Sequence, residues 1–180
     1  MKIEKMIISE EVLERARHLE ETGMTTLIKQ CYPFVFRFFY YRSITRSDAE
    51  DLTSEVFVRV VNSIKGQKGY FPAWLFSIAK NLLTDYYRKK GRSRETSLEE
   101  TEEPISYSDE NKIDVLESKL IKKSLDLLTD EQRAVIMLKF LEGYDNGEIA
   151  KMMNKSVGAI KTLQFRALSA LRGILRRELS

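Results

Sequence analysis

The sequence predicts an all-α fold in which two small helical domains are joined by a flexible acidic linker. Three observations support this prediction. Apolar residues recur at helical spacing in several segments, and N-capping residues precede a number of those segments. Between residues 91 and 111 the periodicity is lost, and Ser, Thr and Glu dominate. A chain of 180 residues is long enough for two small domains.

The composition excludes several classes of protein. The chain has 30 basic and 27 acidic residues and a net charge of +3, so total charge is only weak evidence for a nucleic-acid partner. Cys31 and His18 are the only residues of their kinds, which excludes an intrachain disulfide and a Cys/His zinc cluster. No signal-peptide core and no run of 18 apolar residues is present, so we expect a cytoplasmic chain without membrane insertion.

The first domain is expected at residues 24–94, preceded by a leader helix at residues 1–23 that ends near Gly23. The leader has apolar residues at helical spacing, but its function cannot be read. Residues 24–44 form an aromatic-rich helix that Pro33 kinks or restarts. Ser47 and Glu50 form a capping box that opens a helix to residue 64.

That third helix exposes a polar stripe, formed by Asp51, Ser54, Glu55, Arg59 and Asn62. Clustered carboxylates can indicate metal or acid–base chemistry. Here Asp48, Glu50 and Asp51 suit a helix N-terminus, and Glu55 with Arg59 is an ordinary surface pair. No second cluster completes a catalytic site, so we do not expect an enzyme.

Residues 71–94 predict a long helix with Pro72 in its first turn. Trp74 projects onto the polar face, where an aromatic ring can stack on or wedge between bases. Before this helix lies a loop with two glycines and two lysines, residues 65–70, that could cradle an extruded base. Taken alone, the helix fits an ordinary core helix with a solvated basic end better than a nucleic-acid site.

Residues 95–112 form the acidic linker, and residues 113–180 form the second domain. Thr129 with Gln132 and Asp145 with Glu148 predict two helix starts. Asn154 suits a left-handed turn before a long last helix that Ser156 caps. A short helix, a tight turn and a longer helix make a helix-turn-helix, and residues 149–177 carry seven basic side chains and no acid. This combination favours DNA binding.

Two stretches resemble one family. DAEDLTSEVFVRVV (residues 48–61) followed by FPAWLFSIAKNLLTDYYRKKGR (residues 71–92) resembles the second conserved region of extracytoplasmic-function (ECF) sigma factors of bacterial RNA polymerase. Residues 125–175 resemble their fourth region. The resemblance covers about residues 24–175 in order, with an acidic linker between the two regions as in the family.

The resemblance implies a promoter-specificity subunit that binds core RNA polymerase, needs no cofactor and catalyses nothing itself. The surface matching the polymerase contact comprises Asp51, Ser54, Glu55 and Arg59. The part that captures melted minus-ten bases matches Asn62, Lys65, Lys68, Tyr70, Trp74, Asn81, Asp85 and Arg88. The reader of the minus-thirty-five element matches Lys155, Ser156, Gly158, Ala159, Lys161, Thr162, Phe165, Arg166 and Arg172.

The chain departs from common family patterns at two of these places. Trp74 matches the first of two tandem aromatics of housekeeping sigma factors, but Leu75 stands at the second, which implies weaker melting and stricter promoter choice. Leu163 stands where many members carry Arg, which leaves more of the reading to Phe165 and Arg166.

The expected partners are core RNA polymerase, promoter DNA and, from the family, an anti-sigma factor. Two other functions stay open. A conventional helix-turn-helix regulator would bind duplex operator DNA without polymerase, with residues 1–95 as a sensor or dimerisation domain. A DNA-processing enzyme would need a nucleophile or metal cluster, for which the only candidates are the carboxylates between Asp48 and Glu55.

Overall fold

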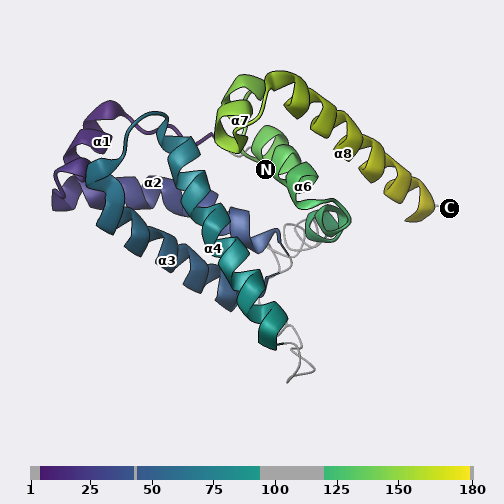
Figure 1. The fold of residues 1–180 in the computed structure, drawn as a ribbon, viewed down its shortest axis with the longest axis horizontal. Coiled ribbons are helices and arrows are strands. Elements are labelled where there is room, and N and C mark those ends of the chain that lie inside the picture. The colour runs from purple at the N-terminus through teal and green to yellow at the C-terminus, as the bar shows by residue number, and fades with distance from the viewer. Residues whose placement is uncertain (1–4, 43, 94–119, 179–180) are drawn as a thin grey trace, which may run out of the picture.

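The computed structural model describes residues 5–42, 44–93 and 120–178, all of which lie in helices or in the loops between them (Figure 1). The first group comprises α1 (Glu10–Arg17), α2 (Glu21–Tyr40), α3 (Arg46–Ser63) and α4 (Phe71–Ser93), with a 3-10 turn at Ile64–Gly66. The second comprises a helical segment at residues 120–126, α6 (Asp130–Ile136), a π-helical segment at Met137–Leu141, α7 (Asn146–Met153) and α8 (Val157–Glu178). The expected all-α fold is confirmed for these residues. The predicted linker, 95–112, lies outside them.

The helix starts of the second group follow their capping residues. Thr129 with Gln132 and Asp145 with Glu148 form complete capping boxes. Asn154 has φ 52° and ψ 50°, the left-handed conformation expected for the turn between α7 and α8. The helix-turn-helix prediction is therefore confirmed in its local geometry.

The predicted capping box at Ser47 is wrong. The N-cap of α3 is Thr45, whose hydroxyl accepts a hydrogen bond from the N–H of Asp48 at 3.1 Å. Because Thr45 already satisfies this N–H, the helix begins at Arg46 and includes Ser47.

The leader helix is shorter than expected, and α2 begins before Gly23 instead of after it. A Cβ atom at position 23 would lie 2.5 Å from the Cβ atom of Arg15, so the glycine allows α1 to pack closely on α2. Pro33 lies inside α2 and does not divide it. Leu13 and Ala16 of α1 are buried in the same core as α2 and α3, so α1 is an integral part of the first group.

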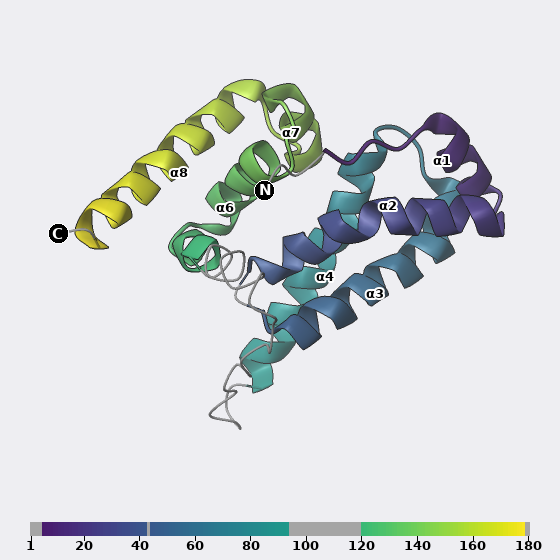
Figure 2. The ribbon, with the colours of Figure 1, turned by 180° about the vertical axis from the view of Figure 1, so that it is seen from behind.

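The two groups of helices share one hydrophobic core, and α7 packs against α4. At the contact the ring of Phe34 on α2 meets the ring of Tyr144 edge to face, with centroids 6.2 Å apart. Seen from either side, α6 and α7 lie against the bundle of α1 to α4, whereas α8 extends away from it (Figures 1 and 2). The two predicted domains are thus packed together along the described residues.

A bidentate ion pair connects the two groups. The Nε and Nη2 atoms of Arg37 each donate to one carboxylate oxygen of Glu142, both at 2.7 Å. The Glu142 side chain is only 2% exposed. Its position depends on the π-helical segment, because the Glu142 N–H bonds to the Met137 carbonyl five residues back, and Gly143 with φ 73° then ends the helix.

A second arginine is buried nearby without a carboxylate partner among the described residues. The guanidinium of Arg42 lies 3.7 Å from the centroid of the Phe38 ring, and its Nη1 donates to the Phe38 carbonyl at 2.7 Å. Burial, together with the neighbouring charge of Arg133, lowers the pKa of Arg42 to about 9. The side chain therefore stays charged at neutral pH, held mainly by a ring face and a carbonyl.

We expect Glu142→Gln to lower the free energy of unfolding by about 2 to 3 kcal/mol, because the change leaves the Arg37 charge partly buried without its counterion. Urea denaturation followed by circular dichroism measures this difference. Glu20→Gln is the matched control, since it breaks an exposed pair with Arg15 and should cost less than about 1 kcal/mol. Equal effects of the two variants would contradict the prediction.

Cys31 should resist thiol reagents in the folded chain. The side chain is fully buried on α2, and desolvation raises the pKa of its thiol to about 12, so almost no thiolate exists at mildly alkaline pH. Alkylation should be on the order of 100-fold slower in buffer than in urea. Rates of similar size in both solvents would show that this face of α2 is open.

Candidate nucleic-acid interface

The polar stripe on α3 lies on the outer surface as predicted. Asp51, Ser54 and Glu55 are exposed, and Arg59 is half-buried. The Arg59 guanidinium donates to Glu55 at 2.8 Å, and the Ser54 hydroxyl donates to the Glu50 carbonyl of its own helix. The stripe therefore presents the exposed carboxylate of Asp51 and one ion pair, Glu55 with Arg59, that a partner can reorganise.

Two valines extend this surface and were missed by the sequence analysis. Val58 is 59% exposed and Val61 is 39% exposed, beside Glu55 and Asn62. Val58 follows Ser54 by four residues and Glu55 by three, and Val61 follows Val58 by three, which places both valines on the same face of the helix. This helical spacing is the sequence pattern from which the two valines could have been assigned to the surface. Exposed apolar side chains flanked by charges are typical of a protein-binding surface.

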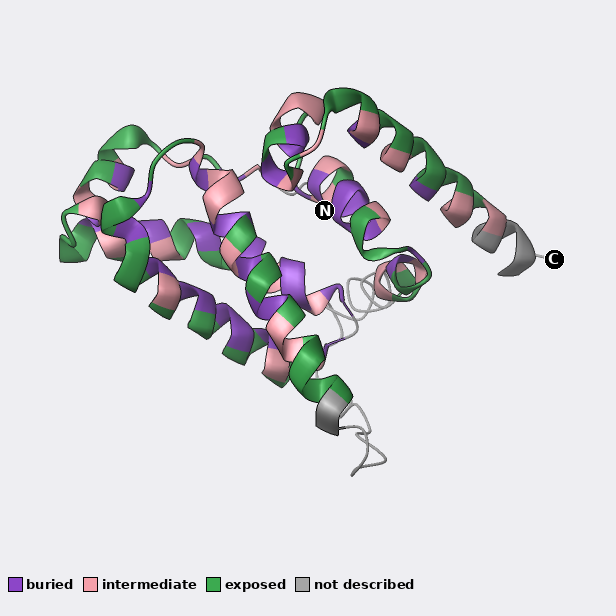
Figure 3. Cartoon of the chain, viewed as in Figure 1, coloured by how far each residue is buried: buried purple, intermediate pink, exposed green. Residues whose placement is uncertain are grey.

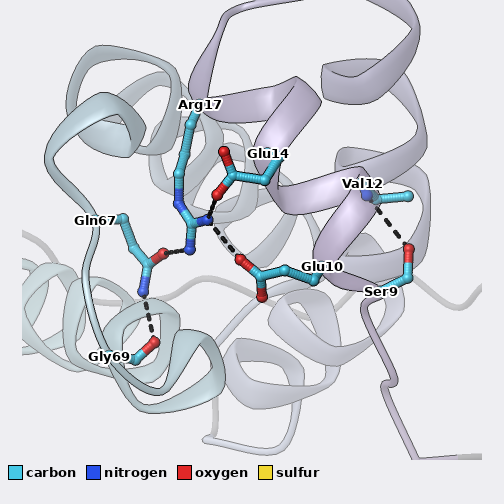
Figure 4. A network of polar contacts seen from close by, with 7 residues as sticks. All are labelled: Ser9, Glu10, Val12, Glu14, Arg17, Gln67 and Gly69. Carbon is cyan, nitrogen blue, oxygen red and sulfur yellow. Dashed lines mark hydrogen bonds and ion pairs between the residues drawn. The ribbon is translucent and has the colours of Figure 1, made fainter.

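The loop between α3 and α4 is supported by the leader helix. The Nη2 atom of Arg17 donates to the side-chain oxygen of Gln67 at 2.7 Å, and the Gln67 amide donates to the Gly69 carbonyl at 3.1 Å (Figure 4). Arg17 also pairs with Glu10 and Glu14 on its own helix. Because Gln67 is nearly fully buried, the neighbouring Lys65 and Lys68 are held outward and exposed.

The predicted minus-ten residues of α4 fall into two groups. Asn81 and Arg88 are exposed, and Arg88 donates to the half-buried Asp85 at 3.0 Å. Tyr70 and Trp74, at the start of the helix, are half-buried, and the Trp74 ring packs on that of Phe71 with centroids 5.7 Å apart. The aromatic end of the site is therefore covered more than its polar end.

The cover on Tyr70 comes from α7. The Tyr70 hydroxyl donates to Oε1 of Glu148 at 3.2 Å, and the Lys151 ammonium lies 5.6 Å from the centroid of its ring. Burial, with the Glu148 carboxylate beside it, raises the pKa of Tyr70 to about 12. The hydroxyl thus stays protonated and acts as a donor. The sequence analysis did not foresee that this residue contacts the other group of helices.

The predicted minus-thirty-five surface is the outer face of α8. Exposed positions dominate the first turns of this helix (Figure 3). The Phe165 side chain is 72% exposed, a large apolar ring in water with cations around it. The other exposed members of the predicted set are Ser156, Gly158, Lys161, Thr162, Arg166 and Arg172. Ala159 is half-buried on the same helix.

Three of the predicted contacts already have partners within the chain. The Ser156 hydroxyl accepts from the N–H of Ala159 at 3.1 Å, so it caps α8. The Lys155 ammonium pairs with Glu131 on α6 at 2.8 Å. The Thr162 hydroxyl donates to the Gly158 carbonyl at 3.1 Å. Their proposed contacts with DNA stay predictions. The Ser156 hydroxyl can still donate, the Thr162 hydroxyl can still accept, and the Lys155 ammonium has further N–H donors.

The described side chains form exposed polar and basic surfaces on α3, α4 and α8. Among them no group of three His, Cys, Asp or Glu residues is arranged to hold a metal ion. No helix within the described ranges has the length and apolar character needed to cross a membrane. An exposed aromatic ring among arginine and lysine side chains on a helix-turn-helix is suited to the grooves and phosphates of DNA.

Known families match both halves of the chain in order. Sigma-70 region 2 matches residues 27–93, and Sigma-70 region 4 matches residues 118–171. Among similar proteins, ECF RNA polymerase sigma factor SigX of Bacillus subtilis is 33% identical over 157 residues, covering 81% of each chain. BldN of Streptomyces coelicolor, also an ECF RNA polymerase sigma factor, is 36% identical over 92% of this chain. The chain spans 65% of the length of BldN.

Solved structures agree on the fold. CnrH, solved in complex with the cytosolic domain of CnrY, aligns with a TM-score of 0.73 at 21% identity, over 92% of this chain and 96% of the solved one. Sigma factor RpoE of Bartonella quintana aligns with a TM-score of 0.65 at 24% identity, over 84% and 96%. The paired region 2 and region 4 matches and the identity to SigX show that the chain belongs to the ECF sigma factors of RNA polymerase.

Proposed function

We propose that this chain is an alternative sigma factor that binds core RNA polymerase and directs it to a specific set of promoters. The observation that carries the proposal is the ordered pair of sigma regions, each with its predicted contact surface at least partly exposed. It acts by recognition and has no catalytic activity of its own. We place it in the cytoplasm, where its polymerase and promoter DNA are found.

The outer face of α3 is the proposed contact with polymerase. Asp51 and Glu55 supply charge for an oppositely charged surface, and Val58 supplies apolar area next to them. A contact of this kind combines a small buried apolar centre with a charged rim. Arg59 and Ser54 complete the same face.

The region from Asn62 to Arg88 is the proposed reader of the melted minus-ten element. Lys65 and Lys68 are exposed on the loop that α1 supports, where they suit phosphates of the displaced strand. Trp74 provides an aromatic face beside that loop, and Asn81 provides an amide that can bond to a base edge.

The start of α8 is the proposed reader of the minus-thirty-five element in duplex DNA. The small residues Gly158 and Ala159 let the helix approach the major groove closely. Phe165 and Arg166 project from the next turns, where a ring can contact a thymine methyl group and a guanidinium can bond to guanine. Lys161 and Arg172 are placed to contact phosphates, which fixes orientation without reading sequence.

An anti-sigma factor is a further proposed partner. The solved RpoE of Bartonella quintana is bound to the anti-sigma factor NepR, and this likeness of fold supports a partner of the same kind for this chain. Such a partner would act by covering one or more of the three surfaces described above.

Runoff transcription tests the proposal. Purified core polymerase, fragmented genomic DNA and the chain are combined, and the RNA starts that appear only when the chain is added are sequenced. We expect starts that share two spaced upstream motifs, together with comigration of the chain and core polymerase. Binding to duplex DNA alone, with no new starts and no comigration, would make the chain a conventional helix-turn-helix regulator.

Arg166→Ala should weaken binding to the cognate minus-thirty-five duplex by about 1 to 3 kcal/mol and relax the preference at one base position, because a bidentate base contact is lost. Arg172→Ala is the matched control, as it should weaken binding about equally on all sequences. Fluorescence anisotropy with a set of single-base variants of the duplex measures both. A uniform loss for Arg166→Ala would make it a phosphate contact instead.

A further inference from the structure

The segment that precedes α1 runs across the molecule to α7, and both views of the fold show this path (Figures 1 and 2). Lys5 forms an ion pair with Glu148 of α7, and its ammonium lies 5.3 Å from the centroid of the Tyr144 ring. A Cβ atom at Gly143 would lie 3.7 Å from the Cβ atom of Lys5. Met6 is buried in the shared core. We call residues 5–9 the strap.

The strap binds the carboxylate that covers Tyr70. Oε1 of Glu148 is shared between the Lys5 ammonium and the Tyr70 hydroxyl. Lys151, one turn further along α7, lies against the face of the Tyr70 ring. Because the proposed function assigns Tyr70 to the minus-ten surface, this contact places a carboxylate and a helix where DNA would have to bind.

The packing between the two groups of helices is incomplete, which allows the groups to separate. Among the described residues, the Tyr144 hydroxyl and Nε of Arg42 are buried without a hydrogen-bond partner, and separation would return both to water. A cavity of about 100 Å³ also remains between the groups, with Phe38, Leu83 and Met153 in its lining. Such an interface is less favourable than a fully packed core, so additional contacts at its edge shift the balance between closed and open forms.

We propose that residues 5–9 act as an intramolecular strap, which holds α7 against Tyr70, just before α4, through Lys5 and Glu148 and thereby keeps the aromatic end of the minus-ten surface covered in the free chain. The strap is inferred from its contacts alone. The effect of the strap on DNA binding rests on the proposed function, which assigns Tyr70 to the minus-ten surface. Opening exposes Tyr70 and frees α7 and α8 to move with the second domain.

Small-angle X-ray scattering of the full chain tests the strap without polymerase or DNA. Lys5→Glu places two carboxylates together and should raise the ratio of open to closed molecules about five- to tenfold, seen as a larger radius of gyration. Lys5→Arg retains the pair and should match the wild-type chain. Lys29→Glu makes the same charge change at an exposed position of α2 and should also leave the radius unchanged. Circular dichroism checks that all variants keep their helices.

A second readout tests the covered surface. A single-stranded oligonucleotide carrying the minus-ten motif from the runoff starts should bind Lys5→Glu about five- to tenfold more tightly than the wild-type chain, in the absence of polymerase. An unchanged radius for Lys5→Glu, or an equal increase for Lys29→Glu, would overturn the strap. A larger radius without tighter oligonucleotide binding would overturn the claim that the strap covers the minus-ten surface. Failure of runoff transcription, with the radius still changed, would count against the proposed function alone.

Discussion

The arrangement of the two sigma regions depends on the bidentate pair between Arg37 and Glu142. It joins α2 to the end of the π-helical segment, and its carboxylate is almost completely removed from water. A buried charge tolerates few positions of its partner, because any displacement leaves it unsolvated. This pair therefore helps to hold the second group of helices against the first in the closed form, where the ring of Tyr144, two residues on, packs against Phe34.

Helix starts and turns could be predicted from the sequence, whereas the contacts between helices distant in the sequence could not. Thr129 and Asp145 mark their helix starts because an N-cap and its partner are three residues apart, and Asn154 marks the turn by its own conformation. Arg37 and Glu142 are 105 residues apart in the sequence, and the residues around each of them do not predict that they form an ion pair. The π-helical segment that directs Glu142 inward has an ordinary helical sequence. The error at Ser47 arose because Thr45, two residues earlier, is also a good cap.

For the candidate binding surfaces too, some features could be predicted from the sequence and others could not. Exposure of Asp51, Glu55 and Arg166 follows from helical periodicity, so these positions could be placed from the sequence. Periodicity does not report which polar groups have already found partners within the chain. The cap that Ser156 forms on α8 was predicted from the sequence, but the pair between Lys155 and Glu131 on α6 was not. For Tyr70 the competing contact comes from a different sigma region, beyond the reach of any local pattern.

In the closed arrangement the two proposed DNA surfaces differ in accessibility, so they can bind promoter DNA in a definite order. The outer face of α8 is exposed, with the Phe165 ring in water, while the aromatic start of α4 is covered by α7. The proposed duplex-DNA surface is therefore accessible, whereas the proposed single-stranded-DNA surface is covered at its aromatic end, Tyr70. A ligand shifts such an equilibrium only by its difference in affinity for the two forms. The outer face of α3 is exposed and takes no part in the contacts of Glu148 with Lys5 and Tyr70, so binding at that face does not by itself break them. Opening requires a partner that separates α7 from α4, by holding the two sigma regions at a spacing that the strap cannot span.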